Sequence, residues 1–216
     1  MDNLKMIAAA AAIQAVEDEM IIGVGTGSTV NYFIEQLALI RHKLDACVAS
    51  SKTTEALLKA AHIPVVDLNA VNAVDLYVDG ADEVNAQGVM IKGGGGALTR
   101  EKIVATAAKQ FICIVDANKV VKRLGEFPVA VEVLPMARSM VARAIVKLGG
   151  DPQYREGFLT DNGNIILDVY NLEINTPIAL EEQFKLITGV VDSGLFAKRI
   201  ADKILVGTNN GVEVLK

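Results

Sequence analysis

The stretch "MIIGVGTGST", residues 20–29, joins an apolar run to a loop in which glycines alternate with other residues. Apolar residues then recur at helical spacing as far as residue 43. A strand, a glycine loop and a helix in this order are typical of the start of a βαβ unit. In such a unit the first N–H groups of the helix can bind an anion.

The same alternation continues along the chain. Helical periodicity is found at 4–17, 29–43, 53–61 and 97–109, and short β-branched runs at 20–25, 47–50, 64–68, 76–80 and 111–117. Apolar strands that alternate with helices predict a Rossmann-like α/β fold, with a mainly parallel sheet and helices on both faces. Ligands of such sheets bind beyond the carboxyl ends of the strands.

From Phe127 the order of elements changes. We expect strands at 128–133, 154–160, 165–171 and 190–196, helices at 135–149 and 177–187, and a hairpin turn at "DNGN" (161–164). The order β-α-β-β-α-β is that of a ferredoxin-like unit. The tail predicts one more hairpin, with its turn at 209–211. The sequence therefore predicts a Rossmann-like α/β domain (1–126 and 198–216) with an inserted ferredoxin-like α+β subdomain (127–197).

Composition limits the class of protein. The chain has 216 residues, of which 51% are hydrophobic, and a net charge of −5. This suffices for a core, and the lack of a basic run argues against nucleic acid as a partner. The opening "MDNLKMIAAAAAIQAV" carries an aspartate in its leader, which favours a cytosolic helix over a signal peptide. No apolar stretch is long enough to span a bilayer, so we expect a cytoplasmic protein.

The cysteines and histidines are poor candidates for chemistry. Cys47 and Cys113 lie in apolar runs, which favours buried thiols. His42 and His62 lie in polar contexts at helix ends, which favours solvated side chains. Acid–base chemistry would then fall to carboxylates and lysines.

The loop "GVGTGST" (23–29) fails two familiar patterns. A dinucleotide-binding fingerprint needs glycine where Ser28 stands, and a P-loop needs lysine where Gly27 stands. Glycines, three hydroxyls (Thr26, Ser28, Thr29) and a helix N-terminus remain. They favour a phosphate-sized anion site over an ordinary capped helix.

Carboxylates follow "LYV" (76–78), in "DGADEV" (79–84). Asp79 and Asp82 are consistent with a plain turn, since aspartate and glycine are favoured there. A magnesium pair is a second interpretation. Lys92, at the end of the next apolar segment, weakens it because a lysine competes with a cation for the same carboxylates.

The stretch "KGGGGALTREK" begins at Lys92 and ends in a helix with Glu101 near its start. Successive glycine N–H groups can form a concave nest for negative charge. Glu101 alone is also consistent with an acidic residue in a first helical turn. Together with the aspartates and the anion loop, these residues fit proton abstraction next to a carbonyl in a phosphorylated substrate. A carboxylate would act as the base, and N–H groups would stabilise the enediolate.

Six motifs resemble the ribose-5-phosphate isomerase A family: "GVGTGST", "YVDGADE", "IKGGGGALTREK", "FICIVDANK", "VEVLPMA" and "TDNGNIILDV". They occur in the family's order between Gly23 and Asp168. The resemblance implies reversible isomerisation of D-ribose 5-phosphate and D-ribulose 5-phosphate in the pentose phosphate pathway. It also implies no metal or organic cofactor, and a homodimer or higher homo-oligomer.

The resemblance also implies roles for individual residues. Glu101 would be the general base, Asp79 would assist ring opening and proton handling, and Asp82 and Lys92 would lie near the reacting oxygens. The substrate-binding residues implied are Thr26, Gly27, Ser28, Thr29, Asp79, Gly80, Ala81, Asp82, Lys92, Gly93, Gly94, Gly95, Lys119 and Lys5.

Two other functions fit part of the pattern. One is a non-catalytic sugar-phosphate sensor of the kind found in transcriptional regulators, although residues 1–19 are too few for a helix-turn-helix. The other is a related sugar-phosphate enzyme or coenzyme A transferase, in which a glutamate also lies beside glycines.

Overall fold

The computed structural model describes residues 2–216, and the chain folds as two compact units. The first unit contains the residues up to Ala81, Arg100–Val120 and Ala201–Lys216, and the second contains Asp82–Thr99 and Val121–Ile200. The predicted domain boundaries remain a proposal, and the compact second unit also takes in the glycine run and residues 121–126.

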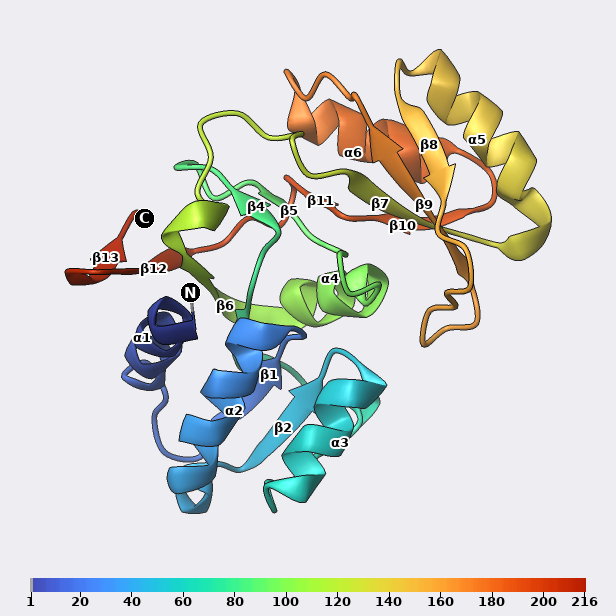
Figure 1. Ribbon diagram of the computed structural model, residues 1–216. Coiled ribbons are helices and arrows are strands. Elements are labelled where there is room, and N and C mark those ends of the chain that lie inside the picture. The colour runs from blue at the N-terminus through green and yellow to red at the C-terminus, as the bar shows by residue number, and fades with distance from the viewer. Residues whose placement is uncertain (1) are drawn as a thin grey trace. The chain divides into compact units, whose positions relative to one another are not determined.

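The first unit is built on a six-stranded sheet in the order β13-β12-β6-β3-β1-β2 (Figure 1). The strands are β1 (Ile21–Val24), β2 (Ala46–Ala49), β3 (Val74–Asp79), β6 (Ala108–Asp116), β12 (Lys203–Thr208) and β13 (Gly211–Val214). All pairings are parallel except that of β12 with β13, the predicted C-terminal hairpin. The predicted mainly parallel sheet is confirmed.

Helices pack on both faces of this sheet: α1, α2 and α3 share one buried cluster with the strands, whereas Val104 of α4 lies beside Gly23 on the other face. Their bounds are α1 (Asp2–Ile13), α2 (Ser28–Leu39), α3 (Lys52–Ala60) and α4 (Leu98–Ala107). Alanines of α1 and the apolar face of α2, including Phe33 and Leu37, pack on Ile22, Val78 and Ile112 of the strands. Burial of these residues supplies the main driving force for folding of the first unit.

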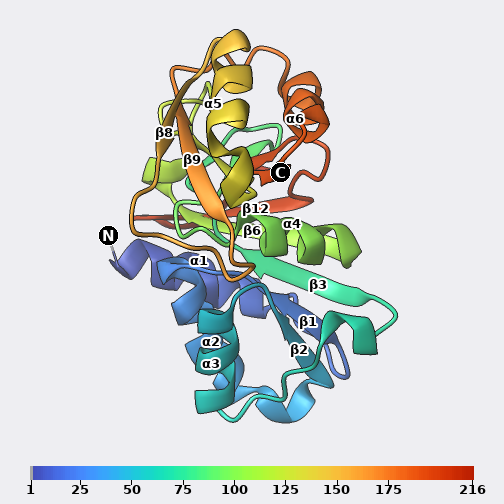
Figure 2. The same ribbon diagram turned by 90° about the vertical axis from the view of Figure 1, so that its right-hand side faces the viewer.

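The second unit contains the predicted ferredoxin-like arrangement. Its four-stranded antiparallel sheet has the order β10-β7-β9-β8, and α5 and α6 pack against it (Figure 2). The elements are β7 (Val129–Val133), α5 (Arg138–Lys147), β8 (Asp151–Tyr154), β9 (Ile165–Tyr170), α6 (Pro177–Leu186) and β10 (Val190–Ser193). A smaller sheet joins β4 (Glu83–Val84), β5 (Met90–Ile91) and β11 (Leu195–Phe196).

Three predicted strands are wrong in part. Residues 64–68 make only an isolated bridge, between Val65 and Cys47, and run into a short 3-10 turn, η2 (Leu68–Ala70). The strand predicted at 154–160 ends at Tyr154, because a turn with Gly157 at φ 69° follows it. The strand predicted at 190–196 is divided between two sheets as β10 and β11.

No helix among residues 2–216 combines the length and the apolar character that a membrane span requires.

Both cysteines are free and buried, as the sequence predicts. Cys47 lies in β2 without exposed surface, and burial raises its pKa from 9.0 to about 12. A raised thiol pKa means that the folded state holds its proton at a pH at which the unfolded chain has lost it. The contribution of this thiol to stability is therefore complete below pH 9.0 and is lost as the pH rises toward 12.

We predict that iodoacetamide at pH 8 alkylates neither cysteine of the native protein at an appreciable rate. Only the thiolate reacts, and a buried thiol is both protonated and inaccessible. Mass spectrometry should show two alkylated cysteines after unfolding in guanidinium chloride and none before it. Rapid alkylation of Cys47 in the native protein would contradict the buried position.

Candidate active site

The predicted site residues of the first unit follow its central parallel strands. Thr26 to Thr29 follow β1, Asp79 ends β3, and Lys119 follows β6 in a 3-10 turn, η3 (Ala117–Lys119). Since β1 pairs in parallel with β3, and β3 with β6, these residues lie at the same edge of the sheet. The structure thus brings together the predicted anion loop and Asp79.

Asp79 is fully buried at the end of β3. Its Oδ1 accepts hydrogen bonds from the backbone N–H groups of Thr26 (3.0 Å) and Gly80 (2.7 Å). Its Oδ2 accepts a hydrogen bond from the Tyr77 hydroxyl. A Cβ on Gly25 would lie 2.0 Å from this carboxylate, so only glycine fits at that position. Asp79 is therefore held in one orientation by β1, β3 and the loop after β1.

Tyr77 explains how the buried carboxylate is stabilised. Burial, and then the negative charges of Asp79 and Glu101, raise the pKa of Tyr77 well above its ordinary value. The hydroxyl therefore stays protonated and donates to Asp79 at physiological pH.

The predicted anion loop precedes a helix end that no side chain caps. Gly27 is the N-cap of α2, with φ 125°, and its position would leave a Cβ in open space. Ser28 is exposed, and its hydroxyl accepts a hydrogen bond of 2.9 Å from Lys5 Nζ of α1. Lys5 is thus placed at the loop, where a cation and N–H donors favour an anion.

Thr26 has a different set of contacts from Ser28. Its hydroxyl lies 2.9 Å from those of Ser50 and Ser51 and 3.3 Å from that of Thr54. The Thr54 hydroxyl donates to the carbonyl of Gly25. This hydroxyl cluster fixes the loop to the end of β2 and the start of α3, so the contact of Thr26 with a ligand remains a prediction.

The predicted residues of the second unit surround the glycine turn. Asp82 Oδ2 accepts a hydrogen bond of 2.8 Å from the N–H of Gly94. Lys92 is 3% exposed, and its Nζ lies 5.7 Å from the centroid of the Phe196 ring. Gly94 and Gly95 are exposed, and the N–H of Gly94 is bonded to Asp82. In this unit the structure brings Asp82 to the turn.

A buried glutamate supports the start of α4. Glu132 of β7 has no exposed surface and accepts hydrogen bonds from the hydroxyls of Thr99 and Thr160. Two amides from the turn before β9, those of Asn162 and Asn164, also donate to it. Thr99 precedes Glu101 by two residues in α4, so this network fixes the first turn of the helix that carries the predicted base.

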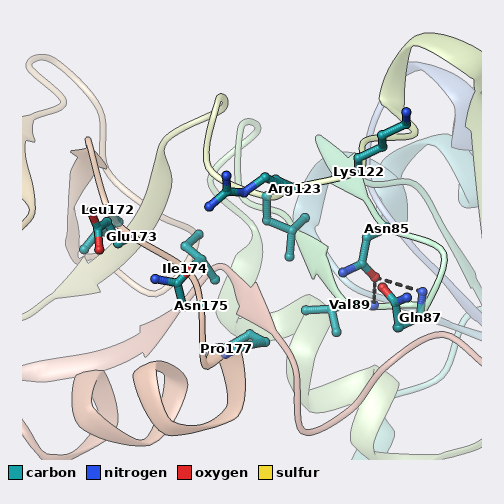
Figure 3. Close-up of a pocket in the computed structure, with 11 residues that line it drawn as sticks. Asn85, Gln87, Val89, Lys122, Arg123, Leu172, Glu173, Ile174, Asn175 and Pro177 are labelled. Atoms are coloured by element: carbon teal, nitrogen blue, oxygen red, sulfur yellow. Dashed lines mark hydrogen bonds between the residues drawn. The ribbon is translucent and has the colours of Figure 1, made fainter.

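A separate pocket of about 550 Å³ lies in the second unit and contains none of the predicted residues (Figure 3). Asn85 closes one side, where its Oδ1 accepts hydrogen bonds from the N–H groups of Gln87 and Val89. Lys122, Arg123 and Glu173 on its border are exposed to solvent. These charged side chains are exposed and include both positive and negative groups, so the pocket indicates no particular class of ligand.

Sequence reasoning missed Tyr77, the serines after β2 and Glu132. One signal was available for Tyr77, because it precedes Asp79 by two residues in a strand and therefore lies on the same face. Ser50 and Ser51 follow β2 at the same sheet edge. Ligands of such sheets bind beyond the carboxyl ends of the strands, so both serines were candidate site residues. Nothing in the local pattern marks Glu132, because its partners come from 28 to 33 residues away.

Comparisons with known proteins identify related chains. The family model of ribose 5-phosphate isomerase A (phosphoriboisomerase A) matches residues 46–211. The chain is 71% identical to the ribose-5-phosphate isomerase A of Legionella pneumophila (strain Lens) over the full length of both chains. The crystal structure of ribose 5-phosphate isomerase A from Neisseria gonorrhoeae is 47% identical, with a TM-score of 0.97 over 99% of this chain and 96% of that one.

A further solved structure is that of a D-ribose-5-phosphate isomerase in complex with phospho-erythronic acid. It is 39% identical, with a TM-score of 0.93 over 99% of this chain and 97% of that one.

The fold and these matches define a sugar-phosphate isomerase. The chain belongs to the ribose 5-phosphate isomerase A family. The resemblance seen in the sequence, the fold class and the prediction of an isomerase are confirmed.

We predict that Lys5→Met weakens the binding of inorganic phosphate, measured as a competitive inhibitor, by about 10- to 100-fold. A hydrogen bond to a charged group contributes roughly 1.5–3 kcal/mol, and the Lys5 ammonium lies at the anion loop. Lys43→Met is the control, because Lys43 forms an ion pair with Asp18, in which both side chains are exposed. Equal inhibition of both variants and the wild type would contradict a phosphate contact by Lys5.

Proposed function

We propose that Glu101 is the general base with which the chain interconverts D-ribose 5-phosphate and D-ribulose 5-phosphate. The carboxylate would remove the proton from C2 of the open-chain aldose and return it to C1. The carbon–carbon double bond of the enediolate forms and is lost again in the process, and no electrons leave the substrate. This reaction requires a base, a means of moving protons between the oxygens, and donors that stabilise the oxyanion.

The observation that best supports a catalytic site at this edge of the sheet is the environment of Asp79. A buried carboxylate held by three donors has a fixed position at the sheet edge where ligands of this fold bind. We assign to it the ring opening and the proton transfers at the sugar oxygens. Burial of Glu101, which is 4% exposed, favours proton transfer away from bulk water.

The phosphate of the substrate would bind at the start of α2. Backbone N–H groups of Gly27, Ser28 and Thr29 point out of an uncapped helix end, and Lys5 adds a positive charge. Lys119 and the backbone of Gly80 and Ala81, at the ends of β6 and β3, would contact the sugar hydroxyls.

The glycine turn would bind the reacting oxygens. Gly93, Gly94 and Gly95 would contribute backbone donors, and Lys92 with Asp82 would complete the polar surroundings of the enediolate. Lys92 supplies a positive charge for the oxyanion, and Asp82 orients the turn through the N–H of Gly94.

We further propose that the chain acts in the cytoplasm, in the pentose phosphate pathway, as a homodimer or a higher homo-oligomer. The negative charge, −5, agrees with small-molecule substrates rather than nucleic acid.

We predict that Glu101→Gln lowers kcat by roughly 10²–10⁴ with little change in KM, because the amide keeps the shape and loses the basicity. Exchange of solvent deuterium into the reacting carbon should fall in parallel. Glu55→Gln is the matched control, since Glu55 also lies in the first turn of a helix of the first unit, α3, where it pairs with Lys59. Near-normal turnover of Glu101→Gln would show that the base lies elsewhere.

We also predict that exhaustive dialysis against a chelator leaves kcat unchanged. Among residues 2–216 no group of three or more histidines, cysteines and acidic residues is arranged to hold a metal ion. Loss of activity that added Mg²⁺ or Mn²⁺ restores would instead indicate an ion bound by the aspartates. Zinc content by atomic absorption provides an independent measurement.

A further inference from the structure

The sequence does not determine how the peptide groups of the four consecutive glycines, Gly93 to Gly96, are oriented. Without side chains, each peptide group between Gly93 and Gly96 can turn its N–H to either side at low cost. The turn itself closes through a hydrogen bond of 2.9 Å from the N–H of Gly96 to the carbonyl of Gly93, with both residues at positive φ. A concave set of donors requires that the N–H groups of these peptides lie on the same side of the turn. Another group must therefore bind their carbonyls on the opposite side.

Arg155, which directly follows β8, contacts these carbonyls. Its guanidinium donates to the carbonyl of Gly93 from both Nη1 and Nη2, each at 3.2 Å. Nη1 also donates to the carbonyl of Gly94 at 3.2 Å. One side chain therefore binds two successive peptide groups of the turn.

Asp168 of β9 fixes the guanidinium in place. Arg155 Nε lies 2.8 Å from Oδ2 of Asp168, and Nη2 lies 2.5 Å from Oδ1. The Arg155 side chain is 19% exposed and that of Asp168 is 16% exposed, so water screens this two-point ion pair only in part. The ring of Phe158, 5.3 Å from the guanidinium carbon, covers another side and fills the space beside Gly96.

The orientation of the N–H groups follows from peptide geometry. The structure contains no cis peptide bond among residues 2–216, and in a trans peptide the C=O and N–H point in opposite directions. Because Arg155 holds the carbonyl of Gly93, the N–H of Gly94 points the other way, where it donates to Asp82 Oδ2 at 2.8 Å. By the same geometry, the N–H of Gly95 points away from Arg155. The positive charge on the carbonyl side also polarises both peptides and makes their N–H groups stronger donors.

We propose that Arg155, held by Asp168, is a positioning residue for the isomerisation. It fixes the two peptide groups of the glycine turn with their N–H groups on the side of Asp82. This inference rests on the proposed role of the turn as donor to the enediolate. Arg155 acts through the backbone and need not touch the substrate, so its removal should raise the barrier of the chemical step rather than weaken substrate binding.

The first test measures the kinetics of Arg155→Gln in the full-length protein. We expect kcat to fall roughly 10- to 100-fold with KM changed less than about threefold, because misplaced oxyanion donors slow the chemical step. Asp168→Asn should lower kcat in the same direction by less. Arg138→Gln is the matched control, because Arg138 stacks on Tyr154, the neighbour of Arg155, at 4.8 Å. The control should retain wild-type kcat.

Two further measurements separate positioning from a loss of folding. Guanidinium ion at millimolar concentration should restore part of the kcat of an Arg155→Ala variant, which a merely unfolded variant would not show. In protein labelled with ¹⁵N-glycine, the amide signals of Gly94 and Gly95 should shift in Arg155→Gln, whereas those of Gly149 and Gly163 should not.

Each outcome decides the proposal. Unchanged kcat in Arg155→Gln, unchanged Gly94 and Gly95 signals, or a fall in kcat that matches a loss of folded protein would overturn it. Near-normal turnover of Glu101→Gln would instead overturn the proposed base and leave the Arg155 result standing. A shift of the two glycine signals together with the kcat loss and the rescue supports the positioning role.

Discussion

The first unit depends on the burial of one carboxylate, that of Asp79. A buried carboxylate is costly unless hydrogen bonds satisfy it. Here two backbone N–H groups and the Tyr77 hydroxyl do so. This arrangement requires β1 next to β3, a glycine at position 25, and a tyrosine that stays protonated beside two negative charges. The central strand order, the loop sequence and the composition of β3 therefore serve the same group.

Much of the fold follows from local sequence patterns. The parallel sheet can be predicted from the alternation of short apolar runs with helical segments. The spacing of apolar residues in each strand differs from that in the neighbouring helices, so the elements can be told apart. The β-α-β-β-α-β order likewise predicts the antiparallel sheet of the second unit. The failures have local causes. Residues 64–68 are apolar and β-branched, yet they lie beside the edge strand β2 and make one bridge only. Residues 190–196 look like one strand, yet the chain leaves one sheet for another at Gly194, where a Cβ would lie 2.0 Å from the carbonyl of Lys92.

The candidate site also contains some residues that the sequence predicts and others that it does not. Asp79, the anion loop and the glycine turn are recognisable because each is a short motif directly after a strand, and Lys5 was found by resemblance alone. Residues that support them are distant in sequence and carry no motif. Arg155 lies about 60 residues from the glycines that it contacts, and Glu132 lies 33 residues from Thr99. Pairwise contacts of this range depend on the tertiary fold, and no periodicity in a single sequence predicts them.

The order in which the ribosome makes the chain has a consequence for its folding. Neither unit is formed by one continuous segment of the chain. The first unit is incomplete until β12 is synthesised and pairs with β6, and the small sheet of the second is incomplete until β11 is synthesised and pairs with β5. Long-range pairings of this kind form slowly, and until β12 emerges β6 is an unprotected edge on which nascent chains can associate. A nascent chain that ends before residue 155 therefore contains Asp79, Lys92 and Glu101. It lacks Arg155, which contacts the glycine turn, and β12, which pairs with β6.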